Sequence, residues 1–256
     1  MHTLTVPGNG RVQASESDLW ARPVRGYRAG TRRGVLYSHH SGGTGKTPLD
    51  WTNNAGTARL CEALAANYAF ASSDLGGSAL CGNTTAQTRL GQLDAWCIAS
   101  GTDRPRASTA PRIAVGVSGG VTALVNYYGT SPGHVADLAA LVLILPLWDL
   151  DYAYQTNPSG VRAVIEAAWG VTHPTALPAG ADPRGNTTLI GAANIPTRIY
   201  YASDDPLYTA QIISDMVAAF GNQASAVNVG ALGHTDAAIA AIDRAELVSW
   251  LRTVAP

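Results

Sequence analysis

The chain has 256 residues, of which 46% are hydrophobic and only 14% are charged. This length and hydrophobic content suffice for one large buried core, and we expect a single domain over residues 1–256. The 17 basic and 18 acidic residues give a formal charge of −1. No net field therefore attracts nucleic acid or an anionic membrane, and a small, nearly neutral substrate fits better.

The start of the sequence lacks the charged region and the apolar stretch of a secretory signal peptide. The longest apolar run, Leu138 to Trp148, contains Pro146 and is too short to span a bilayer. We therefore expect a soluble protein with no transmembrane segment. The cellular compartment stays open.

The three cysteines, Cys61, Cys81 and Cys97, lack the spacing of metal ligands, and their odd number leaves at least one unpaired. Cys81 and Cys97 flank a predicted helix, which separates them by ~24 Å and excludes a disulfide between them. We expect buried thiols, because free cysteine is among the most buried residue types. A Cys61–Cys81 bridge stays possible, and no metal or cofactor is implied.

From residue 34 onward, short apolar runs alternate with helical patterns, which is typical of βα units around a mainly parallel sheet. In chain order we expect strand Gly34–Ser38, helix Gly56–Tyr68, strand Ala69–Ser72, helix Thr85–Ser100, strand Arg112–Val117, helix Gly119–Tyr128, strand Ala139–Leu145, helix Gly160–Trp169, strand Arg198–Ala202, helix Thr209–Phe220, strand Ala226–Val229 and helix Asp236–Thr253. One or two antiparallel edge strands precede them, with Thr3–Val6 the clearest. The predicted fold class is α/β, with helices on both faces of the sheet.

The longest connection, residues 149–196, joins the fourth and fifth of these strands and contains the helix Gly160–Trp169. Long connections in compact domains are usually functional lids or caps. We therefore expect a short cap insertion here.

The segment Arg112–Val125 is an apolar strand followed by Gly116-Val117-Ser118-Gly119-Gly120 and a helix of small residues. A G-x-S-x-G pattern between a strand and a helix is typical of a nucleophile elbow. The serine there occupies a strained turn, and side chains beside it would block close packing of the helix on the strand. Ser118 would then project above the sheet, and the Gly119 N–H would form half of an oxyanion hole.

A serine hydroxyl is a weak nucleophile, so a base must accept its proton and a third group must orient that base. Asp204 and Asp205 follow one predicted strand, and His234 follows the next. Ligands gather at the carboxyl ends of strands in open α/β sheets. The order serine, acid, histidine therefore predicts a triad, with Asp204 and Asp205 as alternatives because adjacent aspartates often form turns.

The second oxyanion donor is expected in the loop Ser38–Gly43, which follows the first parallel strand. This loop resembles the His-Gly-x loop of α/β hydrolases, with His39 at the histidine, His40 in place of the glycine and Ser41 at the donor position. Because His40 enters the region of positive φ less easily than glycine, Ser41 and Gly42 stay alternative donors.

Together, the motifs at residues 39–43, 116–120, 202–206 and 233–234 resemble those of the α/β hydrolases over nearly the whole chain. The resemblance implies an α/β-hydrolase fold, an esterase- or lipase-like cleavage of carboxylic esters, and Asp205 as the acid. The family usually places its acid three residues after a small residue that ends the strand, here Ala202, and follows it with proline.

A narrower resemblance, to hydrolases among the tail-associated proteins of phages that infect actinobacteria, is carried by four further motifs. They are Ser73–Gly77, Cys81–Asn83, Leu147–Leu150 and Trp169-Gly170. This resemblance implies a lipid ester of the cell envelope as substrate and assembly into a larger particle or a homo-oligomer.

Several residues near the predicted site are candidate substrate contacts. His40 and Gly42 belong to the oxyanion loop, whereas Trp148 and Tyr152 begin the predicted cap and would form an apolar acyl site. Packing in the core explains the two aromatic residues equally well.

Two other functions compete with hydrolysis. The segment His40–Thr47 is one residue short of a phosphate-binding P-loop, but His40 replaces the first glycine and Pro48 stands where a helix should continue. The other alternative is a non-catalytic module that uses the hydrolase fold for attachment or assembly within a virion, since a fold does not fix a function.

Overall fold

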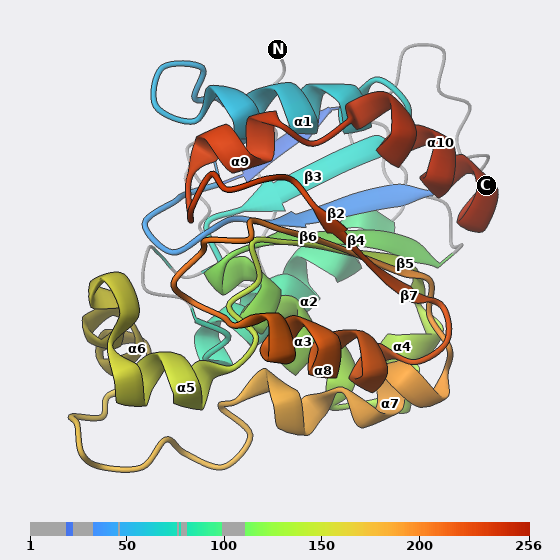
Figure 1. The fold of residues 1–256 in the computed structure, drawn as a ribbon. Coiled ribbons are helices and arrows are strands. Elements are labelled where there is room, and N and C mark those ends of the chain that lie inside the picture. Colours follow the sequence, from blue (N-terminus) through green and yellow to red (C-terminus); the bar gives the residue numbers. More distant parts are fainter. Residues whose placement is uncertain (1–18, 23–32, 46, 76, 78–80, 99–110) are drawn as a thin grey trace.

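The computed structural model describes residues 19–22, 33–45, 47–75, 77, 81–98 and 111–256. Its centre is a seven-stranded sheet in the order β1-β3-β2-β4-β5-β6-β7 (Figure 1). The strands are β1 (Leu19–Arg22), β2 (Gly34–Ser38), β3 (Ala69–Ser73), β4 (Arg112–Val117), β5 (Leu138–Ile144), β6 (Thr197–Tyr201) and β7 (Ala224–Asn228). Only the β1–β3 pair is antiparallel within the described sheet, so the predicted α/β class with a mainly parallel sheet is confirmed.

Helices cover both faces of the sheet (Figure 1). They are α1 (Ala55–Ala65), α2 (Thr84–Ile98), α3 (Gly119–Gly129), α4 (Pro132–Ala136), α5 (Leu150–Thr156), α6 (Val161–Trp169), α7 (Thr188–Ala192), α8 (Ala210–Phe220), α9 (Asp236–Ala240) and α10 (Arg244–Val254). Short 3₁₀ helices occur at Thr47–Leu49, Pro158–Gly160 and Pro183–Asn186. Within the described residues, no helix is long and apolar enough to cross a membrane.

The apolar runs form strands because both faces of the sheet are covered. Along β4, Ile113, Val115 and Val117 pack into the core on the side of α1 and α10, whereas Ala114 packs into the core on the side of α2 and α3. Alternate side chains thus enter opposite layers, as the twofold periodicity of a strand requires.

All six predicted parallel strands are present, with ends shifted by no more than two residues. β1 confirms the expected antiparallel edge strand, while Thr3–Val6 lies outside the described residues. The prediction of one helix over Asp236–Thr253 is wrong: α9 ends at Ala240 and α10 starts at Arg244. The break occurs because the Asp243 carboxylate caps α10, accepting hydrogen bonds from the backbone of Ala245 and Glu246.

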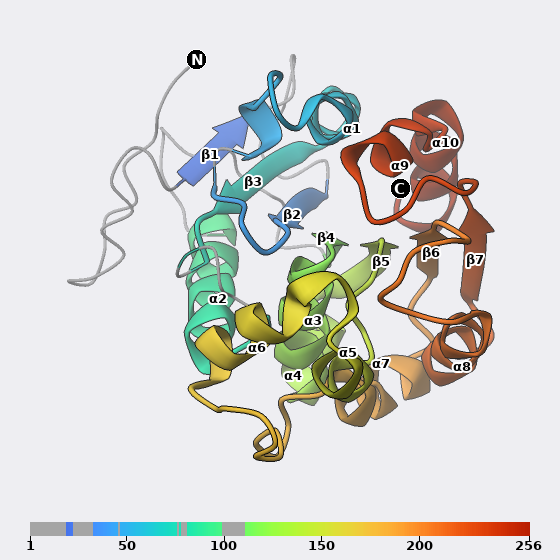
Figure 2. The same cartoon turned by 60° about the vertical axis from the view of Figure 1, so that its left-hand side comes forward.

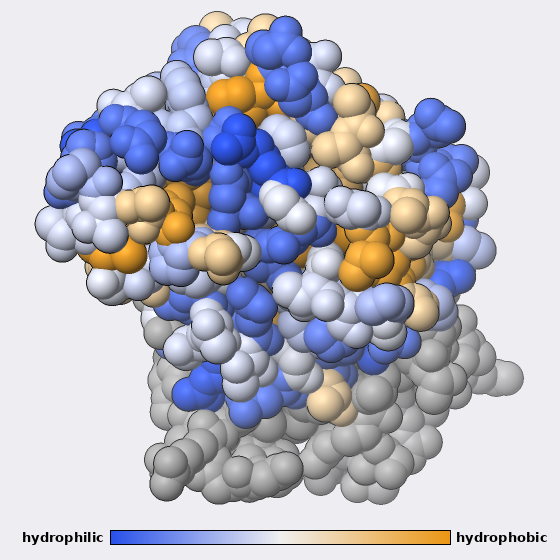
Figure 3. All heavy atoms as spheres, turned by 90° about the horizontal axis from the view of Figure 1, so that it is seen from below, coloured by the Kyte–Doolittle hydropathy of each residue, from blue (hydrophilic) through white to orange (hydrophobic). Residues whose placement is uncertain are grey.

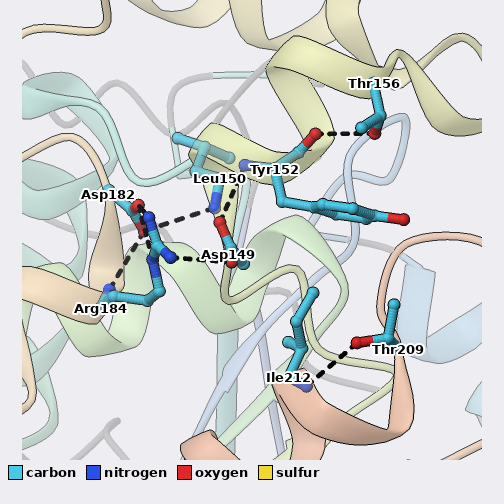
Figure 4. Close-up of polar contacts among 8 residues, drawn as sticks. All are labelled: Asp149, Leu150, Tyr152, Thr156, Asp182, Arg184, Thr209 and Ile212. Atoms are coloured by element: carbon cyan, nitrogen blue, oxygen red, sulfur yellow. Dashed lines mark hydrogen bonds and ion pairs between the residues drawn. The ribbon is translucent and has the colours of Figure 1, made fainter.

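The connection 149–196 begins with α5 and α6, which lie beyond the carboxyl ends of the parallel strands (Figure 2). Ion pairs link the beginning of this connection, at Asp149, to its later part, at Asp182 and Arg184 (Figure 4). The Arg184 guanidinium pairs with Asp149 at 2.9 Å and with Asp182 at 2.8 Å, and Asp182 also accepts a hydrogen bond from the Leu150 N–H. This cluster fixes the start of α5 relative to the rest of the connection.

On the face shown in Figure 3, hydrophobic residues form small separate patches among hydrophilic ones. Scattered apolar residues of this kind are normal on a protein surface. Across the described residues, the large hydrophobic side chains that are exposed are Trp51 and Leu232.

Candidate active site

Ser118 occupies the turn between β4 and α3 with φ 52° and ψ −120°. A non-glycine residue with positive φ is strained and persists only where its surroundings enforce it. Two backbone hydrogen bonds do so: the Ser118 N–H donates to the Ile144 carbonyl at 2.9 Å, and the Val121 N–H donates to the Ser118 carbonyl at 2.9 Å. The predicted elbow is therefore present as a strand–turn–helix.

The glycines of the elbow are explained by close packing. A Cβ atom on Gly116 would lie 3.0 Å from the Val121 Cα and 2.8 Å from a Leu124 methyl group, so the first glycine allows α3 to pack on β4. A Cβ atom on Gly119 would overlap the Ser41 hydroxyl. The glycine beside Ser118 thus allows the loop after β2 to approach the elbow.

His234 and Asp205 complete a chain of hydrogen bonds with Ser118. The His234 Nε2 lies 2.7 Å from the Ser118 Oγ, and the His234 Nδ1 lies 2.6 Å from an Asp205 carboxylate oxygen. With Nδ1–H donating to Asp205, the Nε2 lone pair accepts a hydrogen bond from the Ser118 hydroxyl. The three residues predicted from separate strand ends therefore meet in space.

The Asp205 side chain is fully buried and is itself held by hydrogen bonds. Its carboxylate accepts the Leu207 N–H at 2.9 Å, and the Tyr208 hydroxyl accepts the Ala202 N–H at 3.0 Å. Burial raises the pKa of Tyr208, so this hydroxyl stays protonated and can donate to the carboxylate. The neighbouring Asp204 accepts the Gly233 N–H at 2.6 Å instead.

The loop after β2 brings Ser41 against the elbow. The Ser41 hydroxyl contacts Gly119 and lies 3.4 Å from the Cys81 thiol. Gly42 is exposed with φ 86°, and a Cβ atom there would meet nothing within 4 Å. The positive φ of this loop thus falls at Gly42, two residues after the position at which His40 replaces the family glycine.

Histidines stiffen the same loop. His39 is buried, with its two ring nitrogens 2.8 Å from the His40 carbonyl and 2.9 Å from the Asp74 carbonyl. Burial lowers the pKa of His39. The His40 Nδ1–H donates to the Ser41 carbonyl at 2.7 Å, and this bond fixes the peptide that follows Ser41.

A cavity of about 590 Å³ opens above Ser118 and His234. Its apolar lining is Val117, Leu145, Val161, Val164, Pro206, Leu207 and Ile239, and its polar lining includes His40, Ser41, Asn54, Thr57, Ser159, Thr235 and Asp236. Ser159, Val161 and Val164 come from the connection 149–196. That connection therefore supplies part of the wall, as a cap would.

Three of the predicted substrate contacts, Trp148, Tyr152 and Gly42, are not among the residues that line this cavity. Trp148 is buried in the core cluster that also contains residues of α2, α3 and β5. Tyr152 lies in α5 among the groups around Asp149, outside the lining of the cavity (Figure 4). Gly42 faces solvent. Val161 and Val164 were not predicted as contacts, because the pattern of an amphipathic helix does not show which surface its apolar face meets.

The nucleotide-binding alternative is contradicted by the structure after β2. A P-loop requires an α-helix that starts at its Lys-Thr pair, so that backbone N–H groups point at phosphate. Here Thr47 begins a 3₁₀ helix of three residues, and α1 starts only at Ala55. The Thr47 hydroxyl accepts the Thr44 N–H at 2.8 Å, while Lys46 lies outside the described residues.

Cys61 and Cys81 are buried free thiols, so the possible bridge between them does not form. Burial raises the pKa of Cys81 to about 11. The side chain of Cys97 lies outside the described residues. In the described part of the chain, no three His, Cys, Asp or Glu side chains group together as metal ligands.

The fold resembles that of solved lipases and esterases. A thermophilic esterase from Thermogutta terrifontis superposes with a TM-score of 0.56 at 15% identity, covering 93% of both chains. Est1E from Butyrivibrio proteoclasticus gives 0.62 at 9% identity, covering 92% of this chain and 91% of that one. MPT51 from Mycobacterium tuberculosis gives 0.64 at 13% identity, covering 99% of this chain and 98% of that one.

With its parallel sheet and the strand–turn–helix at Ser118, the chain has the α/β-hydrolase fold. No protein-family model and no curated protein matches the sequence. At these identities, the structural likeness establishes the fold, and the activity is argued from the site.

Proposed function

We propose that this protein is a serine hydrolase that cleaves carboxylic esters, with Ser118 as nucleophile, His234 as base and Asp205 as the group that orients the base. The observation that carries the proposal is the continuous pair of hydrogen bonds, 2.7 Å from Ser118 to His234 and 2.6 Å from His234 to Asp205. A serine that donates to an oriented imidazole is the arrangement that nucleophilic acyl transfer requires.

The reaction proceeds in two halves. His234 accepts the Ser118 proton while Oγ bonds to the ester carbonyl carbon, and the oxyanion accepts hydrogen bonds from the N–H groups of Gly119 and Ser41. The carbonyl re-forms as the alcohol leaves with the proton from His234. Water then gives a proton to His234 and attacks the acyl group, and the acid leaves as Ser118 is reprotonated.

The cavity supports a small ester or one acyl chain as substrate. Its volume of about 590 Å³ lies within the range of small-molecule sites, and Val161, Val164 and Leu207 offer apolar contacts to an acyl group. We propose that residues 149–196 act as a cap within a single domain and that their α6 residues select the acyl group. The resemblance to tail-associated phage hydrolases makes a cell-envelope lipid ester, and assembly into a particle, further predictions.

The decisive test is labelling by a fluorophosphonate probe. We expect stoichiometric labelling of the wild type, complete loss in Ser118→Ala and loss in His234→Ala. Ser159→Ala is the matched control, because Ser159 is exposed in the same cavity and has no histidine partner within the described residues. An unlabelled wild type would refute the proposed hydrolase activity and favour a non-catalytic attachment module.

A series of p-nitrophenyl esters of increasing acyl length then defines the substrate. We expect turnover that depends on Ser118 and an optimum that moves to shorter acyl chains in Val164→Phe, since this substitution narrows the apolar wall. A short-chain optimum in the wild type would argue against a lipid of the cell envelope. Alcohol acceptors added to the same assay separate hydrolysis from acyl transfer.

A further inference from the structure

His234 lies on a loop of which only the first residue, Val229, packs against the hydrophobic core. The loop joins β7 to α9, and its residues Ala231 and Leu232 are exposed, Leu232 by 38%. A base must nevertheless be held within about 0.5 Å of its productive position. Polar contacts must therefore fix this loop.

Two carboxylates flank His234 and provide such contacts. On one side, Asp204 accepts the Gly233 N–H. On the other side, the Asp236 carboxylate accepts three hydrogen bonds: from the Gly56 N–H at 2.6 Å, from the Thr57 N–H at 2.9 Å and from the Thr57 hydroxyl at 2.9 Å. All three donors lie in the first turn of α1, where the helix dipole also favours a negative charge.

The two helices approach each other at this point as closely as backbone allows. A Cβ atom on Gly56 would overlap the Asp236 carbonyl and lie 2.8 Å from the Ala240 N. Only glycine permits this contact between α1 and α9. Gly56, in the first turn of α1, thus allows the close approach in which this turn binds the Asp236 carboxylate.

The same turn of α1 also reaches the oxyanion loop. Asn54, the residue that precedes α1, places its side-chain oxygen 3.2 Å from the His40 Nε2, and the His40 Nδ1–H donates to the Ser41 carbonyl. The start of α1 therefore contacts both the loop that carries the base and the loop that carries the second oxyanion donor.

We propose that Asp236 is a positioning residue, which ties the His234 loop to the helical turn that also holds the oxyanion loop. This inference rests on the proposed hydrolase function. Its carboxylate lies in the cavity wall but is occupied by three donors from α1, so its effect on His234 is exerted through the backbone. Loss of Asp236 should then lower kcat far more than it raises KM.

The test compares Asp236→Ala with Asp243→Ala. Asp243 caps α10 with the same chemistry, accepting two backbone N–H groups, and does not belong to the described cavity lining. We measure kcat and KM on a p-nitrophenyl ester, the rate of fluorophosphonate labelling, and unfolding in urea. Asp236→Ala should lower kcat and the labelling rate by on the order of 10- to 100-fold, with KM changed less than about threefold. Asp243→Ala should leave all three kinetic values unchanged.

Two conservative variants keep the test decisive if Asp236→Ala fails to fold. Asp236→Asn retains one acceptor oxygen and should recover part of the lost kcat. Thr57→Val removes only the side-chain hydroxyl donor and should lower kcat by a few fold. A wild-type kcat in Asp236→Ala, or in both conservative variants, would overturn the inference while leaving the hydrolase intact. An inactive wild type would overturn the proposed function and this inference together.

Discussion

Replacing Gly120 by alanine tests how the elbow and the oxyanion loop are packed. Gly120 is the second residue of α3, and it faces the backbone of the segment that leads from β2 into the oxyanion loop. An added Cβ would overlap the Ser38 carbonyl oxygen and lie 2.5 Å from the His39 carbonyl oxygen. Because these are backbone atoms, no side-chain rotation relieves the overlap.

The size of the effect follows from these distances. Ordinary contact begins at 3.4 Å, so the helix and the loop must separate by about 0.9 Å at His39. Overpacking of this kind costs about 1–3 kcal/mol, and the better helix propensity of alanine offsets at most about 1 kcal/mol. We expect a net loss of about 1–2 kcal/mol in the free energy of unfolding. The same separation moves Ser41 from Gly119, so kcat should fall on the order of 100-fold.

Urea unfolding and p-nitrophenyl ester turnover measure the two effects. The matched control is Gly133→Ala, also at the second residue of a helix, where a Cβ atom would have only the Ser131 hydroxyl nearby, at 3.5 Å. The control should be as stable and as active as the wild type. If Gly120→Ala matched this control in both measurements, the close packing of α3 on the oxyanion loop would be refuted.

Three further results are expected. Burial raises the pKa of Asp94 to about 6 although Arg112 pairs with it, so the folded state keeps a proton that the unfolded state has lost. The free energy of unfolding should therefore fall by about 2 kcal/mol as pH rises from 4 to 6, and Asp94→Asn should flatten this dependence in urea titrations. Cys61 and Cys81 should react with a thiol reagent at pH 8 only after denaturation; rapid labelling of the folded protein would contradict their burial. Tyr208→Phe should lower stability by about 1–3 kcal/mol, because it leaves a buried N–H unpaired, and should lower kcat several-fold; wild-type values for both would exclude its support of the acid.

The strands and the three residues at their ends were predictable because each signal is local. Parallel strands covered on both faces are continuous apolar runs, so β4 and β5 stand out from the sequence. Ser118, Asp205 and His234 each follow a strand within a few residues, and parallel strands bring their carboxyl ends to one edge. Their meeting therefore depends on topology alone.

The features that the sequence analysis missed depend mainly on contacts between residues that are far apart in the chain. Asp236 contacts Gly56 and Thr57 across about 180 residues, and no periodicity encodes such a pairing. Trp148 follows a strand as the triad residues do, but its large apolar ring gains more from the core than from an open cavity. Short helices such as α4 and α7 have five residues each, too few to display a helical period.

Burial divides the site into a rigid part and an exposed part. Ser118 is 7% exposed and Asp205 is 4% exposed, and each is held by the backbone at the end of a buried strand. The His234 side chain is 24% exposed, which suits the proposed mechanism, in which this residue takes a proton from water during deacylation. Polar contacts hold the exposed loop that carries His234, among them the hydrogen bonds accepted by the Asp204 and Asp236 carboxylates. Substitutions at exposed positions such as Leu232 should therefore leave kcat unchanged. Loss of the Asp204 or Asp236 carboxylate should displace His234 and lower kcat.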